Sequence, residues 1–333
     1  MDIHKWENTL AEIGKLVDEE IAKILPKSNE IPNLNDAAWY ILSSGGKRLR
    51  PAVGVLVAEA LGGSIKKALR FGVAVELLHT FCLIHDDIED EDLVRRNRPT
   101  LWMKFGLSHG VNTGDFVLAK VFESIWSLRQ LGLDGVKIID LYDIVTRCLV
   151  ETSEGQAMDI NARSRNNLSQ DEYLQIMSRK TGAYLTLPII GAGIISGAEE
   201  SVINAMRKYG SYVGPAFQVE DDVLDLTEGK GRDALGCDIM EGKRSFMVVF
   251  TAANCTLEER MKLFEVLNKP RKTKTEADIS WTFELFDKYN AVKAAEEKAE
   301  SLIEQGKMEV FALPFGIRSV LYEFADYVVR RSR

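Results

Sequence analysis

Apolar residues recur at helical spacing along almost the whole chain, and this rhythm limits the possible folds more than any other feature. Near the N-terminus one such series consists of Trp6, Leu10, Ile13, Leu16, Val17, Ile21 and Ile24. Steps of mostly three and four residues place these side chains on one face of a helix. The alternation of apolar and polar residues that marks a half-buried strand is nearly absent. The sequence therefore predicts an all-α fold with on the order of ten or more helices.

Signals for helix ends lie between the periodic segments. Two of them, Ser169–Glu172 and Thr256–Glu259, fit the capping box, in which a hydroxyl and a carboxylate satisfy free backbone N–H groups. The polar, basic stretch from Asn268 to Asp278 is expected to be a surface loop between helices, with a domain boundary there as the alternative. Because no internal repeat is found, residues 1–333 are expected to form a single domain.

Three features bear on where the protein works. The longest apolar stretch, Leu185–Ala198, contains Pro188 and three glycines. It is shorter than the roughly 20 residues that span a bilayer, so it is expected to be a buried helix and no transmembrane segment is predicted. Four cysteines without paired spacing favour a reduced, cytoplasmic setting. The net charge of -8 argues against a general nucleic-acid binder.

Two short acidic clusters of the form DDxxD each follow an apolar helical stretch. Their aspartates are Asp86, Asp87 and Asp90 in the first cluster, and Asp221, Asp222 and Asp225 in the second. Residues three and four apart share a helix face, so the charges repel one another unless a cation neutralises them. Mg²⁺ prefers oxygen ligands and often shares its shell with substrate phosphates. A solvated acidic face is the alternative, whereas a calcium loop would require alternate-position ligands and a central glycine that are missing.

Basic residues that suit phosphate groups are also concentrated in the first third of the chain. Gly45 and Gly46 precede Lys47, Arg48 and Arg50, a stretch that lacks the pattern of a Walker phosphate loop and alone reads equally well as a solvated turn. Two more cations, Arg95 and Arg96, follow the first acidic cluster, and arginine pairs bidentately with phosphate oxygens. His79 lies two helical turns before Asp86, where the alternative to phosphate binding is a satisfied core histidine.

Taken in order, these motifs resemble the trans-isoprenyl diphosphate synthase (polyprenyl synthetase) family, and within it the archaeal short-chain geranylgeranyl and farnesyl diphosphate synthases. The segments that carry the resemblance are GGKRLRP, HDDIED, RRNRPT, EGQAMD, KTG, FQVEDDVLD and GCDIMEGKRS, which together cover Gly45 to Ser245. The resemblance implies mostly antiparallel helices around a deep central cavity. It also implies a homodimer.

The resemblance further implies a Mg²⁺-dependent condensation of isopentenyl diphosphate with an allylic diphosphate. About three Mg²⁺ ions would be bound by Asp86, Asp87, Asp90, Asp221 and Asp225, with Asp222 and Lys180 also in the catalytic group. The positions that match the allylic diphosphate site are Arg95, Lys180, Thr181, Gln218 and Lys243. Those that match the isopentenyl diphosphate site are Lys47, Arg50, His79 and Arg96. The GQxxD element supplies Gln156 and Asp159, expected to line the cavity, and Lys230 or Arg232 replaces a loop lysine that does not align.

The residues before the first cluster are expected to set the length of the product. A helix running down from Asp86 places Phe81 and Cys82 about one turn deeper, as a floor for the cavity. By resemblance this combination predicts a C20 product, with C15 or C25 as alternatives; Phe81 as ordinary core packing is also an open reading. A class I terpene cyclase and a non-catalytic partner subunit are the rival functions. The basic residues of a second diphosphate site and the presence of both acidic clusters disfavour them.

Overall fold

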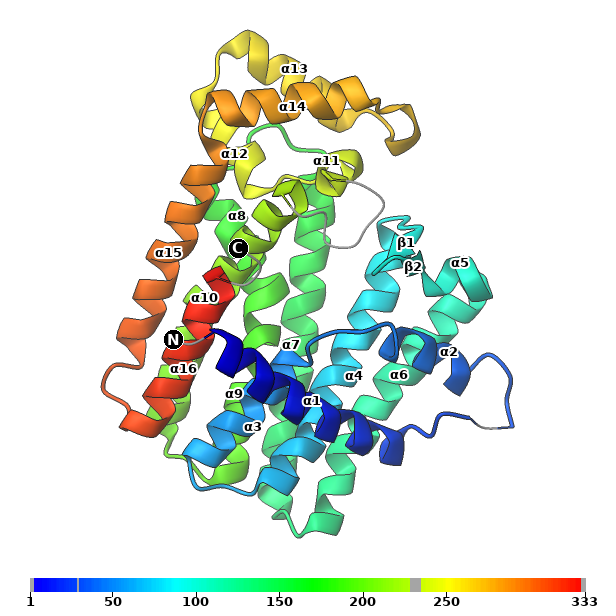
Figure 1. Ribbon diagram of the computed structural model, residues 1–333, viewed down its shortest axis with the longest axis vertical. Coiled ribbons are helices and arrows are strands. Elements are labelled where there is room, and N and C mark those ends of the chain that lie inside the picture. Colours follow the sequence, from blue (N-terminus) through cyan, green and yellow to red (C-terminus); the bar gives the residue numbers. More distant parts are fainter. Residues whose placement is uncertain (1–2, 29, 228–234, 331–333) are drawn as a thin grey trace. The chain divides into compact units, whose positions relative to one another are not determined.

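The structure is a computed structural model that describes residues 3–28, 30–227 and 235–330 of the 333-residue chain (Figure 1). The chain forms two compact units. The first unit comprises residues 1–147, 185–207 and 310–324, and the second comprises residues 148–184, 208–309 and 325–333.

The first unit is built around helices α3, α4 and α6. Within it α4 packs against α3 and α6, while α1 covers α3 and α4 (Figure 1). Its elements are α1 (Ile3–Ile24), α2 (Asn35–Leu42), α3 (Leu49–Ala60), α4 (Ile65–Glu89), β1 (Val94–Arg95), β2 (Arg98–Pro99), α5 (Leu101–Phe105), α6 (Leu107–Ser127) and a 3-10 turn (Leu128–Leu131). It also holds the first part of α7 (Gly135–Ala162), most of α9 (Ala183–Ser196) and the beginnings of α10 (Glu200–Thr227) and α16 (Phe315–Arg330).

The second unit contains the remainder of α7, α10 and α16 and the helices between and after them. Its own elements are α8 (Gln170–Met177), a π-helix (Ser178–Gly182), α11 (Cys237–Glu241), α12 (Phe246–Asn254), α13 (Leu257–Asn268), a 3-10 turn (Arg271–Thr273), α14 (Glu276–Lys288) and α15 (Ala291–Glu309). Helix α12 packs against α8, α14 and α15. The stretch from Asn268 to Asp278 joins α13 to α14 as a loop with one short turn, as predicted.

The local signals read from the sequence explain where several helices begin. Ser169 and Thr256 cap α8 and α13 in complete capping boxes, as predicted, and Thr275 with Asp278 forms a third at α14. The apolar stripe of α1 is buried except at Ile13, which is half-buried, and at Leu16, which is 44% exposed while Val17 is fully buried. Of two adjacent residues at the edge of a stripe only one reaches the core, since neighbours on a helix point about 100° apart.

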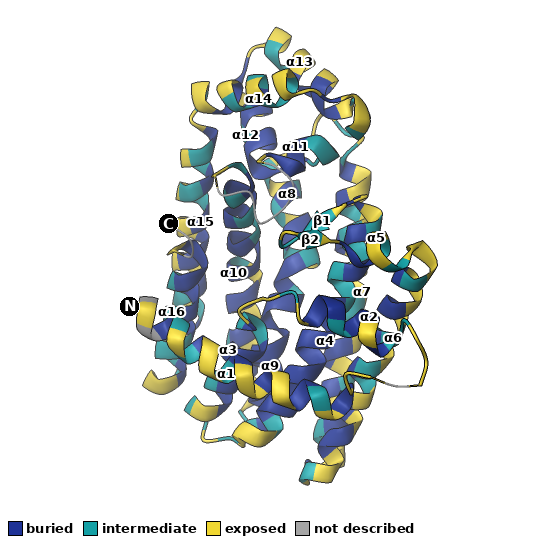
Figure 2. Cartoon of the chain, turned by 45° about the vertical axis from the view of Figure 1, so that its right-hand side comes forward, coloured by how far each residue is buried: buried dark blue, intermediate teal, exposed yellow. Residues whose placement is uncertain are grey.

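Helix α4 is long and apolar enough to cross a membrane by length and composition. However, 72% of its most apolar window is buried inside the protein, and Figure 2 shows the helix in dark blue over most of its length. We therefore assign α4 as a core helix of the first unit. The apolar stretch Leu185–Ala198 likewise forms most of α9 and is largely buried, as predicted.

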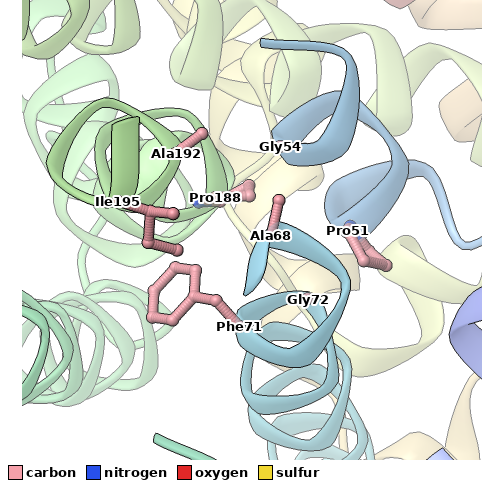
Figure 3. Close-up of a pocket in the computed structure, with 8 residues that line it drawn as sticks. All are labelled: Pro51, Gly54, Ala68, Phe71, Gly72, Pro188, Ala192 and Ile195. Carbon is pink, nitrogen blue, oxygen red and sulfur yellow. The ribbon is translucent and has the colours of Figure 1, made fainter. Parts of the chain in front are cut away.

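The prediction of an all-α fold with many helices is confirmed, because the described residues form helices α1 to α16 with a single two-stranded sheet. A small pocket of about 170 Å³ lies where α3, α4 and α9 meet in the first unit (Figure 3). Its lining is apolar and comprises Pro51, Gly54, Ala68, Phe71, Gly72, Pro188, Ala192 and Ile195. Without polar groups it is a packing gap and no diphosphate site. The single domain and the deep central cavity stay predictions.

Candidate active site

The first aspartate cluster lies at the C-terminal end of α4. Asp87 and Asp90 are buried, with 1% and 7% of their surface exposed, while Asp86 is half-buried. The C-terminal end of a helix carries a partial negative charge, so three carboxylates there are unfavourable without cations. The sequence placed these aspartates near a helix end, and α4 indeed ends at Glu89, with Asp90 as its C-cap.

Arg95 supplies part of the compensating charge. Its Nε donates to Asp87 Oδ1, and its Nη2 lies 3.6 Å from Asp92 Oδ2. The other oxygen of Asp87, Oδ2, is buried and has no hydrogen-bond partner among the described residues. Burial raises the pKa of Asp87 to about 6 despite the adjacent arginine, and the charges of Asp92 and Asp86 act in the same direction. Arg95 therefore compensates the charge of Asp87 only in part.

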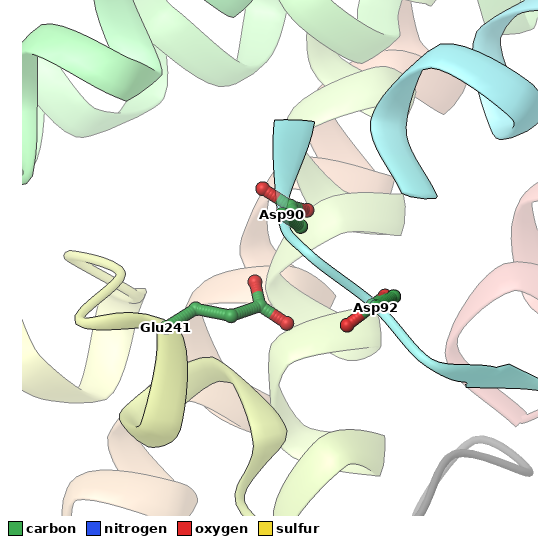
Figure 4. A group of neighbouring side chains, drawn as sticks. All are labelled: Asp90, Asp92 and Glu241. Atoms are coloured by element: carbon green, nitrogen blue, oxygen red, sulfur yellow. The ribbon is translucent and has the colours of Figure 1, made fainter. Parts of the chain in front are cut away.

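The donor set of this cluster fits a hard divalent cation. Ligand oxygens of Asp90 and Asp92 lie within 4.8 Å of each other, on the chain that leaves α4 (Figure 4). Carboxylate oxygens are the ligands that Mg²⁺ prefers, and the unpaired buried oxygen of Asp87 is a further one. Asp92 was not predicted as a ligand, because it falls outside the DDxxD spacing. The sequence signal that points to it is its place at the end of the same acidic run.

Trp102 anchors the chain that follows the first cluster. The indole N–H of Trp102 donates to the backbone carbonyls of Asp87 and Asp92, at 3.0 and 2.9 Å. A hairpin follows, and its two turn residues, Arg96 and Asn97, have φ angles of 51° and 59°. Positive φ at both positions matches a type I′ turn, in which arginine is unfavourable compared with glycine or asparagine. The tertiary contacts of Arg96 must therefore offset a strained backbone.

The charges of four arginines of the first unit act on His79, and we call these residues the arginine group: Arg48, Arg50, Arg95 and Arg96. Burial holds the pKa of His79 well below its usual range, and the positive charges of these arginines lower it further. The pKa of Arg96 is lowered by burial and by its arginine neighbours. Such a concentration of positive charge, with histidine kept neutral as a hydrogen-bonding group, is suited to an anion of high charge density.

The members of the arginine group differ in their partners. Arg48 is buried and donates to Glu76 Oε1 at 2.7 Å and to Asp18 Oδ1 at 2.8 Å. Its charge is therefore compensated by acids of the protein itself. The guanidinium of Arg96 donates to the backbone carbonyl of Gly45. The neighbouring Lys47 is exposed and donates to Glu7 at 2.8 Å. The charges of the predicted residues Arg50 and Arg96 thus both act on the predicted residue His79, and Arg96 contacts the loop that carries Lys47.

The second aspartate cluster lies at the C-terminal end of α10 and is anchored by neutral donors. The buried Asp222 accepts hydrogen bonds from Tyr173 Oη at 2.7 Å, from the backbone N–H of Phe246 at 3.0 Å and from Gln218 Nε2 at 3.2 Å. Asp225 is fully buried and accepts from the backbone N–H of Asp238 at 3.0 Å, whereas Asp221 is half-buried. Tyr173 is the anchor that sequence reasoning missed, since nothing in its local sequence indicates its partner.

A π-helix places the predicted residues Lys180 and Thr181. Lys180 Nζ donates to the buried Asp159 at 2.6 Å, and Thr181 Oγ1 donates to Gln218 Oε1 at 3.1 Å. Gly155 lets α7 approach the backbone of the π-helix closely, because a Cβ atom at Gly155 would lie 2.3 Å from the Lys180 backbone nitrogen. Wide turns of this kind are frequent at functional sites. Asp159 and Gln156 were both expected to line the cavity. In the structure Asp159 pairs with Lys180, and Gln156 is half-buried on α7.

Lys243 follows α11 and is paired with two carboxylates of that helix. Its Nζ lies 3.3 Å from Asp238 Oδ1 and 2.5 Å from Glu241 Oε2 (Glu241 is drawn in Figure 4). Each cation predicted to bind the allylic diphosphate is therefore paired with an acid of its own unit in the structure. A diphosphate that binds these cations has to compete with those acids. The two candidates for the loop cation, Lys230 and Arg232, lie outside the described residues.

The two residues predicted to form the cavity floor lie on different sides of α4. Helical geometry places Cys82 about 40° around the helix from Asp86, but Phe81 roughly 140° from it. Both side chains are half-buried. The ring of Phe81 contacts the imidazole of His85, with 4.6 Å between ring centroids. Cys82 is therefore the residue more directly below Asp86.

Comparisons with known proteins bear on the same motifs. A model of the polyprenyl synthetase family matches residues 31–286. The chain is 37% identical to the geranylgeranyl pyrophosphate synthase of Geoglobus acetivorans over 321 residues, which cover 96% of this chain and 97% of the relative. It is 30% identical to the geranylfarnesyl diphosphate synthase of Natronomonas pharaonis over 348 residues, covering 98% of each chain. The crystal structure of geranylgeranyl pyrophosphate synthetase from Pyrococcus horikoshii matches with a TM-score of 0.87 and 31% identity, over 98% of this chain and 99% of that one.

Proposed function

The chain belongs to the polyprenyl synthetase family as a short-chain trans-prenyl diphosphate synthase, and we propose that it condenses isopentenyl diphosphate with an allylic diphosphate to give geranylgeranyl diphosphate. The observation that carries the proposal is the arginine group whose charges act on a neutral His79, together with the buried Oδ2 of Asp87, which has no hydrogen-bond partner among the described residues. The first of these is suited to a bare diphosphate, and the second to a metal-bound one.

We assign isopentenyl diphosphate to the arginine group. Arg50, Arg96 and His79, with Lys47 on the adjacent loop, would hold its diphosphate. Arg48 acts differently, because Glu76 and Asp18 keep its guanidinium inside the protein. Its role is to fix the backbone of the loop that carries Lys47 and Arg50.

We assign the allylic diphosphate to the aspartate clusters and the cations beside them. Family members use divalent metal ions bound by aspartate-rich motifs. In this chain Asp86, Asp87, Asp90, Asp221 and Asp225 would hold Mg²⁺, and Asp92 is an additional candidate ligand. When bound, the metal ions stabilise the negative charge of the departing diphosphate. Arg95, Lys180, Thr181, Gln218 and Lys243 would support the same group, while Asp222 and Asp159 position their neighbours.

The chain's own residues then account for the remaining steps. The cations aimed at the diphosphate favour cleavage of the allylic C–O bond, which leaves an allylic cation. The alkene of isopentenyl diphosphate attacks this cation, and loss of a proton, which the released diphosphate accepts, completes the five-carbon extension. An apolar cavity would protect the cation from water. No side-chain nucleophile is required.

The C20 product is the finer part of the proposal. Relatives of similar identity are named as geranylgeranyl and geranylfarnesyl diphosphate synthases, so family membership alone leaves C15, C20 and C25 open. A single aromatic residue, Phe81, near the expected floor supports C20. Replacing Phe81 with alanine is expected to lengthen the product by at least one five-carbon unit, measured by radio-chromatography of the dephosphorylated products. An unchanged length would leave Phe81 as ordinary core packing.

One assay tests the proposed reaction. The purified protein is incubated with Mg²⁺, labelled isopentenyl diphosphate and a C5, C10 or C15 allylic primer, and the products are sized after dephosphorylation. Incorporation of label supports condensation. Release of a hydrocarbon without incorporation would instead support a terpene cyclase, and activity that requires a second protein would support a partner subunit. We also expect a cytoplasmic homodimer, which sedimentation of the active enzyme would test.

A further inference from the structure

Helix α6 approaches α4 very closely along a strip formed by Gly110 and Gly114. A Cβ atom at Gly110 would lie 3.1 Å from Ile88 Cδ1. At Gly114 the space is smaller still, because a Cβ atom there would lie 2.2 Å from His85 Nε2. These residues are four positions apart on α6, so they share one face. The two glycines therefore form notches that receive side chains of α4 at the first aspartate cluster, Ile88 within it and His85 directly before it.

His85 is seated in the second notch without a directional bond. Its Nε2 is buried and has no hydrogen-bond partner among the described residues, and Asp115 Oδ1 lies 3.7 Å away. The imidazole is therefore held mainly by shape, against Gly114. Its ring contacts Phe81, one turn earlier on the same face of α4, at 4.6 Å between centroids with the planes tilted by 50°.

We propose that His85 and Gly114 are positioning residues that set product length by fixing the ring of Phe81. This inference rests on the proposed function, in which Phe81 limits the growing prenyl chain. Phe81 lies roughly 140° around α4 from Asp86, so its reach toward the prenyl chain depends on how its ring is turned. The imidazole occupies the space on the α6 side into which the ring would otherwise rotate. Replacing His85 with alanine would let the phenyl ring of Phe81 rotate away from the prenyl chain, which would deepen the proposed cavity.

The test compares product lengths made from isopentenyl diphosphate and a C15 primer by the Mg²⁺-loaded enzyme. We expect His85→Ala to raise the ratio of C25 and longer products to C20 at least ten-fold, with the KM for isopentenyl diphosphate within about two-fold of the wild type. We expect the double variant His85→Ala, Phe81→Ala to give the same distribution as Phe81→Ala alone, because both changes act through one ring.

Gly114→Ala tests the notch from the opposite helix. The added methyl group has to displace the imidazole, so the product ratio is expected to shift away from that of the wild type. Gly135→Ala is the matched control, since a Cβ atom there would meet nothing within 4 Å, and its products should be unchanged. Thermal denaturation of each variant shows that it is folded before its products are compared.

The outcomes separate this inference from the proposed function. If the wild-type protein incorporates no isopentenyl diphosphate, the proposed function fails. If the wild type elongates the primer while His85→Ala keeps the wild-type product length, only this inference is overturned. Equal lengthening by His85→Ala in the presence and absence of Phe81 also overturns it, since the imidazole would then act independently of the phenyl ring.

Discussion

Asp87 and Asp222 are the middle aspartates of two clusters with the same spacing, yet their surroundings differ. Asp87 is paired with the guanidinium of Arg95 and retains one buried oxygen without a hydrogen-bond partner. Asp222 accepts hydrogen bonds from a tyrosine, a backbone N–H and a glutamine side chain, all of them neutral. Asp87 is therefore compensated in part by charge, while Asp222 accepts hydrogen bonds from neutral donors. The same motif can be stabilised in either way, depending on what its neighbours supply.

The two middle aspartates also differ in how much a bound metal ion would stabilise them. A buried carboxylate with an unsatisfied oxygen carries a desolvation penalty that a cation would relieve. In the second cluster the middle aspartate is already satisfied, which turns it into an anchor for the residues beside it. We therefore expect metal to change the stability of the first cluster more than that of the second.

The largest effect is expected when a carboxylate is removed from either cluster. Asp90→Asn and Asp221→Asn should each lower kcat/KM by about a thousand-fold, roughly 4 kcal/mol, because each change removes a negatively charged carboxylate that we propose as a metal ligand. If both clusters serve one diphosphate, the double variant should lose much less than the product of the two single losses. Steady-state kinetics with varied Mg²⁺ measure this.

Fully additive losses in the double variant would mean that the clusters act separately. Glu284→Gln is the control for these substitutions, because Glu284 is an exposed acid on α14 and its loss should leave activity unchanged.

Breaking the charged anchor of the first cluster should cost the most stability. Arg95→Met leaves Asp87 buried beside other carboxylates without its cation, so we expect the free energy of unfolding to fall by about 3–5 kcal/mol without Mg²⁺. Added Mg²⁺ should restore part of this loss. Urea denaturation with and without the metal measures both values. Equal losses in the two conditions would argue against a metal ion at Asp87.

Breaking the neutral anchor of the second cluster should cost less. Tyr173→Phe removes one hydrogen bond to Asp222, which corresponds to about 1–3 kcal/mol for a buried carboxylate that keeps its other partners. This loss should not depend on Mg²⁺, in contrast to Arg95→Met. Denaturation under the same two conditions provides the comparison, and a strong Mg²⁺ dependence would show that Asp222 is itself a ligand.

The smallest effect is a pH dependence confined to the first unit. The pKa of His79 lies well below its usual range, so the unfolded chain takes up a proton below about pH 6.5 while the folded chain does not. The stability from neutral His79 is thus present above that pH and is lost as the pH falls, by at most about 1.4 kcal/mol per pH unit.

A matched pair of variants tests this contribution. His79→Gln should lose less stability between pH 7 and pH 5 than the wild type does. Glu284→Gln should keep the wild-type slope, because Glu284 is an exposed acid on α14 of the second unit. Identical slopes for His79→Gln and the wild type would mean that His79 is protonated in the folded protein at pH 5.

Much of the fold was predictable because it depends on local spacing. The apolar period predicted α1, and the capping boxes predicted the starts of α8 and α13. The placement of the DDxxD aspartates at helix ends followed from the same spacing. Leu16, the exposed residue of the α1 stripe, lies at the edge of that stripe, where a small rotation of the helix decides between core and solvent.

The partners of the candidate site residues were not predictable in the same way. In the sequence Arg48 resembles another phosphate-binding cation, but in the structure it forms an ion pair with Glu76, 28 residues away. Tyr173 reaches Asp222 across 49 residues, and no local pattern links them. Asp92 was passed over because its spacing does not fit the motif, although the structure places its oxygens near those of Asp90.

The sequence by itself determined the helical class, the order of the motifs and the kinds of charge brought to the reaction. These properties follow from spacing along a helix and from residue chemistry, which need no knowledge of distant neighbours. Only the tertiary structure decided which cations form ion pairs with buried acids, which aspartate is an anchor and which has an unsatisfied oxygen. Those outcomes depend on burial and on donors from other helices. Burial imposes a desolvation free energy on a charged group, and a residue distant in the sequence supplies the partner that offsets it.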